Sequence, residues 1–192
     1  GYAATMVARA HQRLETWLDG ERYDLFREMR RLTQEIVAKA LFNADVSGTA
    51  KATGDALTVV WDELAARLKT GLLIPESIPT PGNLRFRKAA RRLDEIVYAM
   101  IQEHRASAED TGDLLAVLLK AQDDDGSQMT DRQLRDEVMT IFVAGHETTA
   151  LALTWTWFLL AQHPEAEEKL RAELEQVLGG HAPTARDLPR LE

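Results

Sequence analysis

The stretch from Val138 to Ala161 constrains the fold most, because it is apolar on every face of a helix. Apolar residues recur there at three- and four-residue spacing, as in a helix. Such a helix either is buried in a large core or spans a membrane. The stretch is long enough to span, but a charge in mid-membrane is costly, and Glu147 lies near the middle. We therefore expect a buried core helix, with a membrane span as the alternative.

The same helical spacing continues through almost the whole chain, and no segment reads as a strand. We therefore predict an all-α fold built around the long central helix. The predicted helices cover residues 3–18, 24–42, 55–68, 84–104, 113–121, 130–162 and 164–178. The predicted loops and turns cover residues 47–54, 71–83, 123–126 and 179–192.

Local signals mark the ends of the last two helices. Thr130 is followed three residues later by Gln133, which is the pattern of a capping box. Pro164 suits the first position of a new helix. The pair Gly179-Gly180 is expected to end that helix, because glycine accepts the left-handed conformation of a C-terminal cap.

Charge and composition argue against several classes of protein. The chain has 31 acidic and 23 basic residues, and its densest basic stretch, Arg85 to Arg92, is interrupted by apolar residues at helical spacing. We interpret that stretch as a solvated helix face and expect no nucleic-acid partner. There is no cysteine, which excludes disulfides and thiolate ligands, and we expect no metal ligands among these residues. No signal-peptide pattern opens the chain, so we expect a cytoplasmic protein.

The centre of the long helix, residues 144–149, carries polar groups that need a reason to be there. A buried carboxylate at Glu147 must be paired, hydrated or neutralised. The Thr148 hydroxyl can bond the carbonyl of Ala144, and the helix bulges locally if it does not. Gly145 lets a flat group approach the backbone closely. These residues predict a groove for a ligand and a chain of water molecules, and the alternative is a helix-packing notch with a satisfied acid.

A zinc-protease motif can be excluded at the same place. His146 and Glu147 begin the pattern HExxH, in which two histidines one helical turn apart bind zinc. The position of the second histidine is occupied by Ala150. The pattern is therefore incomplete, and the zinc interpretation fails.

The hexapeptide AGHETT, residues 144–149, matches the pattern [AG]-G-x-[DE]-T-[TS] of the distal helix, helix I, of the cytochromes P450. Its flanks agree with that match. QHPEAEEKLRAELEQVLGG resembles helix J, DLPRLE resembles the lead-in to helix K, and IPTPGNLRFRKA resembles the roof loop and the start of helix G. On this resemblance, residues 1–192 are a partial cytochrome P450 domain that covers roughly helices D to J.

The resemblance implies roles for the residues of this hexapeptide in oxygen activation. Glu147 would be the catalytic acid that relays protons, and Thr148 the hydroxyl that holds a water molecule by hydrogen bond. Ala144 and Gly145 would form the distal groove for haem and oxygen. Thr149 would be a weaker contact in the same groove.

Other residues receive a lesser role or none from the resemblance. Val143 and Phe142 would line the haem or substrate cavity. Leu72 to Ile74 and Phe86 would lie near the substrate roof. His146 has no role in the family pattern, and we interpret it as a packing residue or as a partner of Glu147.

The family holds haem b through a cysteine thiolate, which this chain lacks. The N-terminal sheet region and the ExxR pair of helix K are also not recognised. Glu168 and Arg171 fit ExxR, but they lie on a charged stretch and are interpreted as a surface pair. We expect this chain alone to be inactive. We also expect its uncovered apolar surface to promote self-association.

For the full-length protein, the resemblance implies a monooxygenase that activates dioxygen at haem and inserts one oxygen atom into an apolar organic substrate. Electrons would come from NAD(P)H through a reductase or a ferredoxin. Two alternatives remain open at this point. One is a non-enzymatic all-helical domain for ligand binding or interaction, and the other is a protein with one membrane span.

Overall fold

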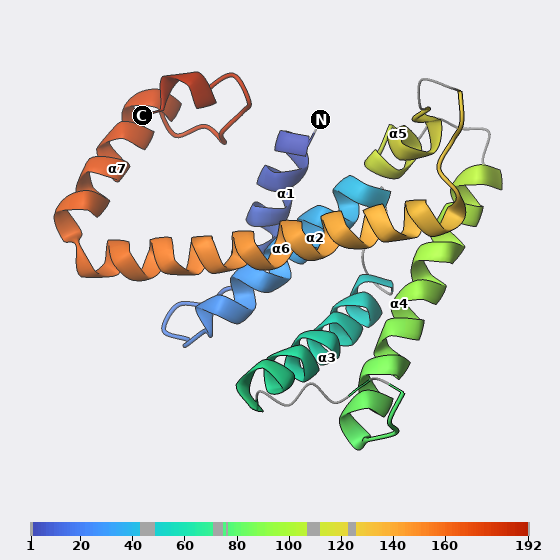
Figure 1. Ribbon diagram of the computed structural model, residues 1–192. Coiled ribbons are helices and arrows are strands. Elements are labelled where there is room, and N and C mark those ends of the chain that lie inside the picture. The colour runs from blue at the N-terminus through green and yellow to red at the C-terminus, as the bar shows by residue number, and fades with distance from the viewer. Residues whose placement is uncertain are drawn as a thin grey trace. The chain divides into compact units, whose positions relative to one another are not determined.

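A computed structural model of the chain describes residues 2–42, 49–70, 75, 77–106, 112–122 and 126–191. Within these ranges the chain forms seven α-helices and one short 3-10 helix (Figure 1). They are α1 (Tyr2–Leu14), α2 (Leu25–Phe42), α3 (Thr49–Thr70), α4 (Pro81–Ala106), α5 (Leu114–Lys120), α6 (Asp131–Gln162), α7 (Pro164–Leu178) and η1 (Leu188–Arg190). The described ranges contain one isolated β-bridge and no strand, so the all-α prediction is confirmed.

The chain divides into two compact units. The first contains residues 1–40 and 143–192, and the second contains residues 41–142. The long helix α6 contributes its first part to the second unit and its remainder to the first.

The predicted ends of α6 and α7 are confirmed. The Thr130 hydroxyl accepts a hydrogen bond from the backbone N–H of Gln133 at 3.3 Å, and the Gln133 side chain accepts one from the backbone N–H of Thr130 at 2.9 Å. This reciprocal pair is the predicted capping box. Pro164 opens α7, and Gly179 closes it with a positive φ of 55°. Both residues act through their backbone conformation, as expected.

The first helix ends earlier than predicted. It stops at Leu14 rather than at residue 18, and the Thr16 hydroxyl donates to the carbonyl of Arg13 at 2.7 Å. Trp17 then stacks on Tyr23 with the ring centroids 5.4 Å apart. The chain turns here because the threonine satisfies a terminal carbonyl and the tryptophan finds its contact outside the helix.

The third helix starts earlier than predicted. It begins at Thr49, so the predicted loop over residues 47–54 is wrong for 49–54. The Thr58 hydroxyl bonds the Gly54 carbonyl at 2.8 Å, as is common inside a helix. The tail was predicted as loop and contains the 3-10 turn η1. Most of the predicted turn at 123–126 and residues 71–74 and 76 of the predicted loop lie outside the described residues.

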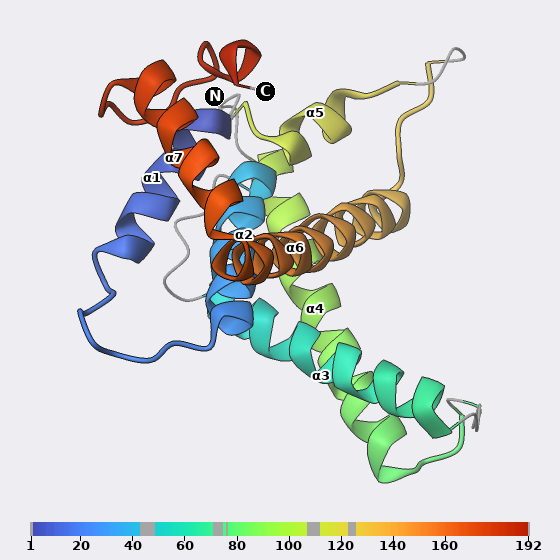
Figure 2. The same ribbon diagram turned by 90° about the vertical axis from the view of Figure 1, so that its left-hand side faces the viewer.

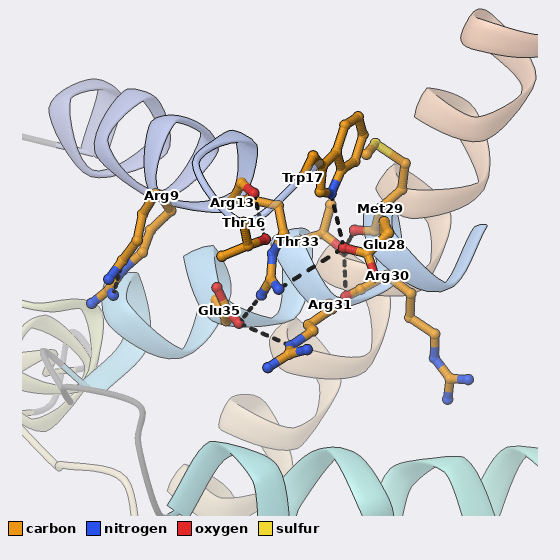
Figure 3. Close-up of polar contacts among 11 residues, drawn as sticks. Arg9, Arg13, Thr16, Trp17, Glu28, Met29, Arg30, Arg31, Thr33 and Glu35 are labelled. Atoms are coloured by element: carbon orange, nitrogen blue, oxygen red, sulfur yellow. Dashed lines mark hydrogen bonds and ion pairs between the residues drawn. The ribbon is translucent and has the colours of Figure 1, made fainter. Parts of the chain in front are cut away.

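In the first unit, a buried arginine joins α1 to α2. Arg13 is 8% exposed and contacts the Glu35 carboxylate, while its second terminal nitrogen lies 3.9 Å from Glu28 Oε2. Figure 3 shows Arg13 reaching from α1 toward these two acids of α2. Both acids lie on α2, about two helical turns apart and on the same face, so the guanidinium can approach both. Met6 and Leu14 of the same helix, α1, are exposed.

In the second unit, α3 packs along α4, and the two helices lie side by side in both views (Figures 1 and 2). The core between the elements of this unit is apolar. Its buried residues include Leu57, Leu93, Val97, Ile101, Leu115, Leu134 and Val138. Arg135 of α6 donates to the Asp94 carboxylate of α4 at 2.6 Å. Burial opposes the charge, but the hydrogen bonds of Arg135 to Asp136 and to Asp94 outweigh it and raise the pKa of Arg135, so the charge is retained at the contact between the two helices.

The start of α4 is held by Asn83, which is buried. Its amide nitrogen donates to the carbonyls of Pro75 and Ile78, both at 2.9 Å. Its amide oxygen accepts a hydrogen bond from Arg67 at 3.0 Å. The Arg67 guanidinium also lies 4.5 Å from the ring centroid of Phe86, within the range of a cation–π contact. Phe86 was predicted to lie near a substrate roof, and its observed contact is with α3.

The sequence left a membrane span open as an alternative for the long helix. Over the described residues, no helix is both long enough and apolar enough to cross a membrane.

Candidate active site

One row of side chains along α6 is buried, and the rest of the helix is not. The buried row takes every fourth residue and is at most 2% exposed: Leu134, Val138, Phe142, His146 and Ala150. Side chains four apart lie on one face of a helix, so the row is a single stripe. Four of its members are apolar, and His146 occupies the remaining position.

The long helix was predicted to be buried on every face, and this prediction is wrong for the second part of α6. None of residues 151–162 is buried. Leu151, Trp155 and Phe158 are about half exposed, at 49%, 55% and 49%. Trp155 and Phe158 contact each other edge to face, with centroids 5.4 Å apart. The prediction is wrong here because the described segments cover only one side of α6, so its other faces remain in contact with solvent.

Gly145 faces α2. A Cβ built on this glycine would meet only the Val37 side chain within 4 Å, at 3.6 Å from its Cγ2 atom. That distance is an ordinary van der Waals contact. The missing side chain therefore points toward α2, as in the packing notch that the sequence left open as an alternative. The neighbouring Ala144 is exposed.

Glu147 is paired with an arginine of α2. Its Oε2 atom lies 3.2 Å from Arg30 Nε and 3.5 Å from His146 Nε2, and its side chain is 27% exposed. The same oxygen is buried and has no hydrogen bond from any residue that the structure describes. Glu147 and Arg30 are therefore close enough for an ion pair, but their geometry is not that of a hydrogen bond. His146 is both a packing residue and a neighbour of the acid, so both interpretations hold.

Thr148 and Thr149 are exposed, and both hydroxyls turn back onto their own helix. Thr148 donates to the Ala144 carbonyl at 2.6 Å, and Thr149 donates to the Gly145 carbonyl at 2.7 Å. Thr148 thus makes the bond considered from the sequence, and α6 is helical through the hexapeptide.

The two residues predicted as catalytic do not touch. Glu147 extends toward Arg30 of α2, whereas Thr148 lies on the exposed face with Ala144. No hydrogen bond joins the two side chains in the part of the chain that the structure describes. A connection between them therefore requires a water molecule or a rotation of the Glu147 side chain.

The residues predicted to line a substrate cavity lie in different surroundings. Phe142 belongs to the buried row and is 2% exposed, while Val143 is half-buried. Their role toward a substrate stays a prediction. Glu168 and Arg171 do not form the expected surface pair, because Arg171 instead bonds Glu167 at 3.0 Å, one helical turn away.

Comparison with known proteins decides the family. A family model described as "Cytochrome P450" matches residues 2–192. The chain belongs to the cytochrome P450 family. Among solved structures, this P450 chain superposes on the haem domain of cytochrome P450DA with a TM-score of 0.86, at 26% identity, over 100% of this chain and 42% of that one. A cyanobacterial P450 with retinoic acid bound shares the fold, with a TM-score of 0.81 at 22% identity.

Curated relatives include three enzymes from Streptomyces. The P450 chain is 41% identical to cyclooctatin synthase and 37% identical to cyclooctat-9-en-7-ol 5-monooxygenase, both of Streptomyces melanosporofaciens. It is 34% identical to pentalenene oxygenase of Streptomyces avermitilis. Each match covers at least 99% of this chain and 42% of the relative. The chain thus spans about two-fifths of the length of these relatives.

Two contact residues of the P450 site were missed by sequence reasoning. Arg30 pairs with Glu147, and the Thr33 hydroxyl lies 2.9 Å from the His146 carbonyl. Both belong to α2, more than 100 positions earlier in the chain. The available signal was a polar residue on the otherwise apolar side of a predicted helix, since Thr33 is 4% exposed. That signal marks a buried contact without naming the partner.

Proposed function

We propose that the whole protein is a haem monooxygenase that activates dioxygen and inserts one oxygen atom into an apolar organic substrate. The observation that carries this proposal is that an acid, Glu147, and a hydroxyl residue, Thr148, are neighbours in the centre of α6. One is a partly buried acid with an oxygen that lacks a hydrogen bond, and the other is a hydroxyl on the adjacent exposed face. Membership of the P450 family supports the assignment.

The exposed face at Ala144 and Thr148 fits a flat macrocycle. The two residues are one helical turn apart, both are exposed, and neither is bulky. When bound, haem supplies the iron at which dioxygen is activated. Its thiolate ligand must come from a part of the whole protein beyond these 192 residues, because they contain no cysteine. Gly145 faces α2, so we assign it to close helix packing behind this face.

Thr148 is suited to hold a water molecule by accepting a hydrogen bond from it. A hydroxyl has one hydrogen, and that of Thr148 is donated to the Ala144 carbonyl. Its oxygen keeps lone pairs that face the exposed side of α6. A water molecule that donates to this oxygen keeps its second hydrogen for a neighbouring acceptor. By orienting this water molecule, Thr148 determines to which neighbour the water can donate its second proton.

Glu147 is suited to relay protons from solvent. Its carboxylate is partly exposed, so it can exchange protons with bulk water. Arg30 and His146 hold Oε2 on the α2 side, and a rotation of the side chain or a bridging water is needed to reach Thr148. We assign proton transfer to Glu147 and the positioning of water to Thr148.

The names of the relatives support a proposal for the substrate class. Their names specify oxidation of pentalenene, which is an alkene, and of an alcohol with one double bond. We propose an apolar hydrocarbon, or an alcohol derived from one, as the substrate. Electrons are proposed to come from NAD(P)H through a reductase or a ferredoxin.

The proposed function is tested on the whole protein by reduction under carbon monoxide. We expect the red-shifted absorption band of a thiolate-ligated haem, and oxygenated product when NAD(P)H and a redox partner are supplied. The 192-residue chain by itself is expected to give neither, because it contains no cysteine. A whole protein that binds an apolar ligand but neither haem nor oxygen would instead support a non-enzymatic binding domain.

We also propose that the isolated 192-residue chain self-associates through the exposed part of α6. Leu151, Trp155 and Phe158 are about half exposed, so burying the rest of each side chain is worth about half of the roughly 1.5–3 kcal/mol for a fully exposed one. Sedimentation velocity should detect dimers or larger species. Trp155→Glu combined with Phe158→Glu should shift the population toward monomer. Val117→Glu, which also replaces an exposed apolar residue but lies on α5, should leave the distribution unchanged.

A further inference from the structure

Three residues of α2 face three consecutive residues of the α6 centre. Arg30 lies 3.2 Å from the Glu147 carboxylate, and Thr33 lies 2.9 Å from the His146 carbonyl. Val37 meets the position of a Cβ on Gly145. Positions 30, 33 and 37 are spaced three and four apart, so they form one stripe of α2. This stripe of α2 is therefore the surface that contacts α6 next to Glu147.

The contact made by Thr33 is buried and well formed. Thr33 is 4% exposed and His146 is 1% exposed. The hydroxyl lies within reach of the Met29 and Arg30 carbonyls at 3.0 and 3.1 Å, and closest to that of His146 at 2.9 Å. A hydroxyl donates one hydrogen at a time. Its bond to His146 is the only one of the three that joins two helices. Figure 3 shows Thr33 and Arg30 on the same helix, with the Arg30 side chain extending away from Arg13.

Three successive carbonyls at the centre of α6 each accept a hydrogen bond from a threonine hydroxyl. In a regular helix each carbonyl accepts from the N–H four residues on. The carbonyls of Ala144, Gly145 and His146 also receive the hydroxyls of Thr148, Thr149 and Thr33, in that order. Shared acceptors weaken the backbone bonds and favour bending of a helix. Thr148 and Thr149 move with α6, whereas Thr33 belongs to α2 and therefore ties this bend-prone backbone to a neighbour.

We propose that Thr33 is a positioning residue for the proton relay. The His146 carbonyl and the Glu147 N–H belong to one planar peptide group. By holding that carbonyl, Thr33 fixes the plane from which the Glu147 side chain departs, while Arg30 holds the far end of the same side chain. Thr33 thus fixes the start of the side chain whose rotation, or whose bridging water, connects the carboxylate to the water bound at Thr148. The inference rests on the proposed function of Glu147 and Thr148.

The test uses Thr33→Val and Thr33→Ser in the whole haem-loaded protein. Valine keeps the shape of threonine and removes the hydroxyl, and serine keeps the hydroxyl. A neutral hydrogen bond of about 1 kcal/mol corresponds to a roughly fivefold change in a rate. We expect Thr33→Val to lower kcat and the product formed per NAD(P)H about fivefold, with KM unchanged. We expect Thr33→Ser to restore both. Thr154→Val, which removes a hydroxyl that bonds only within α6, is the matched control.

A second readout does not depend on turnover. The dipeptide His-Glu occurs once in this sequence, at residues 146–147. Labelling histidine with ¹³C at the carbonyl and glutamate with ¹⁵N therefore isolates one peptide signal within these residues. Loss of the Thr33 donor should shift the His146 carbonyl resonance in Thr33→Val, and serine should restore it. The reduced, carbon-monoxide-bound form is diamagnetic and suits the measurement.

The outcomes separate this inference from the proposed function. If Thr33→Val leaves the carbonyl resonance in place, the hydrogen bond is absent and the inference is overturned. If the resonance moves while kcat and coupling remain those of the wild-type protein, Thr33 is merely structural, which also overturns it. If the wild-type protein forms no oxygenated product, the proposed function fails, and the inference fails with it. A shifted resonance together with impaired coupling, both rescued by serine, supports it.

Discussion

Replacement of Glu147 by glutamine in the whole protein is expected to lower kcat by about a hundredfold or more, the range in which positioned acids and bases contribute to catalysis. Glutamine has the shape of the acid but cannot relay a proton. Because the proposed relay carries protons from solvent, the solvent deuterium isotope effect on kcat should also rise. Substrate affinity should be preserved, since Glu147 faces Arg30 of α2 rather than the exposed side of α6.

The fold should tolerate this change. Glutamine keeps the size of the side chain, and the lost ion pair has no aligned hydrogen bond between Arg30 and Glu147, so its loss is expected to cost about 1 kcal/mol. Glu137→Gln is the matched control, because Glu137 is an exposed acid on the same helix. It should retain the wild-type rate. A Glu147→Gln protein that turns over within twofold of wild type would exclude Glu147 from the relay.

Replacement of Thr148 by alanine is expected to uncouple electron use from product formation. Alanine removes the oxygen that accepts a hydrogen bond from water, so protons arrive without a fixed direction. A lost hydrogen bond to a partly charged group is worth about 1.5 kcal/mol, which corresponds to about a tenfold loss of product per NAD(P)H. Consumption of NAD(P)H should continue, with its electrons appearing as peroxide or water. The measurement is the ratio of product to NAD(P)H consumed.

Thr149 provides a control that the chain itself supplies. It is the next residue, it is also exposed, and its hydroxyl makes the same kind of bond to the carbonyl four residues back, at 2.7 Å. Thr149→Ala should therefore remain close to the wild-type coupling if the role depends on which face of α6 carries the hydroxyl. Thr148→Ser should retain most of the coupling. Equal losses in both alanine variants would contradict the specific role of Thr148.

Local signals in the sequence were sufficient for the fold class and for most helix ends. The capping box at Thr130 and Gln133 and the start of α7 at Pro164 were predicted because each depends on residues within one turn. The end of α1 was missed, because it depends on the contact of Trp17 with Tyr23 across a turn. The start of α3 was missed because small polar residues are equally suited to a loop and to the first turns of a helix.

In the candidate site, too, local features were predictable and contacts with distant residues were not. Residues 144–149 together with their flanks predicted the family, and the bond from Thr148 to Ala144 follows from four-residue spacing on a helix. The partners of the acid were not predictable. Arg30 and Thr33 lie over 100 positions away, and a polar residue on a helix face does not name what it contacts. The buried Arg13 between Glu28 and Glu35 was missed for the same reason.

The sequence by itself determined that the chain is helical, that a polar hexapeptide interrupts its longest apolar helix, and that no cysteine is present to ligate haem. These properties depend on local periodicity and composition. The tertiary structure alone decided that Gly145 faces Val37, that Glu147 extends to Arg30, and that the second part of α6 is exposed. Burial and pairing are set by which distant segments meet a helix face, and the period of a helix specifies the face without specifying what packs against it.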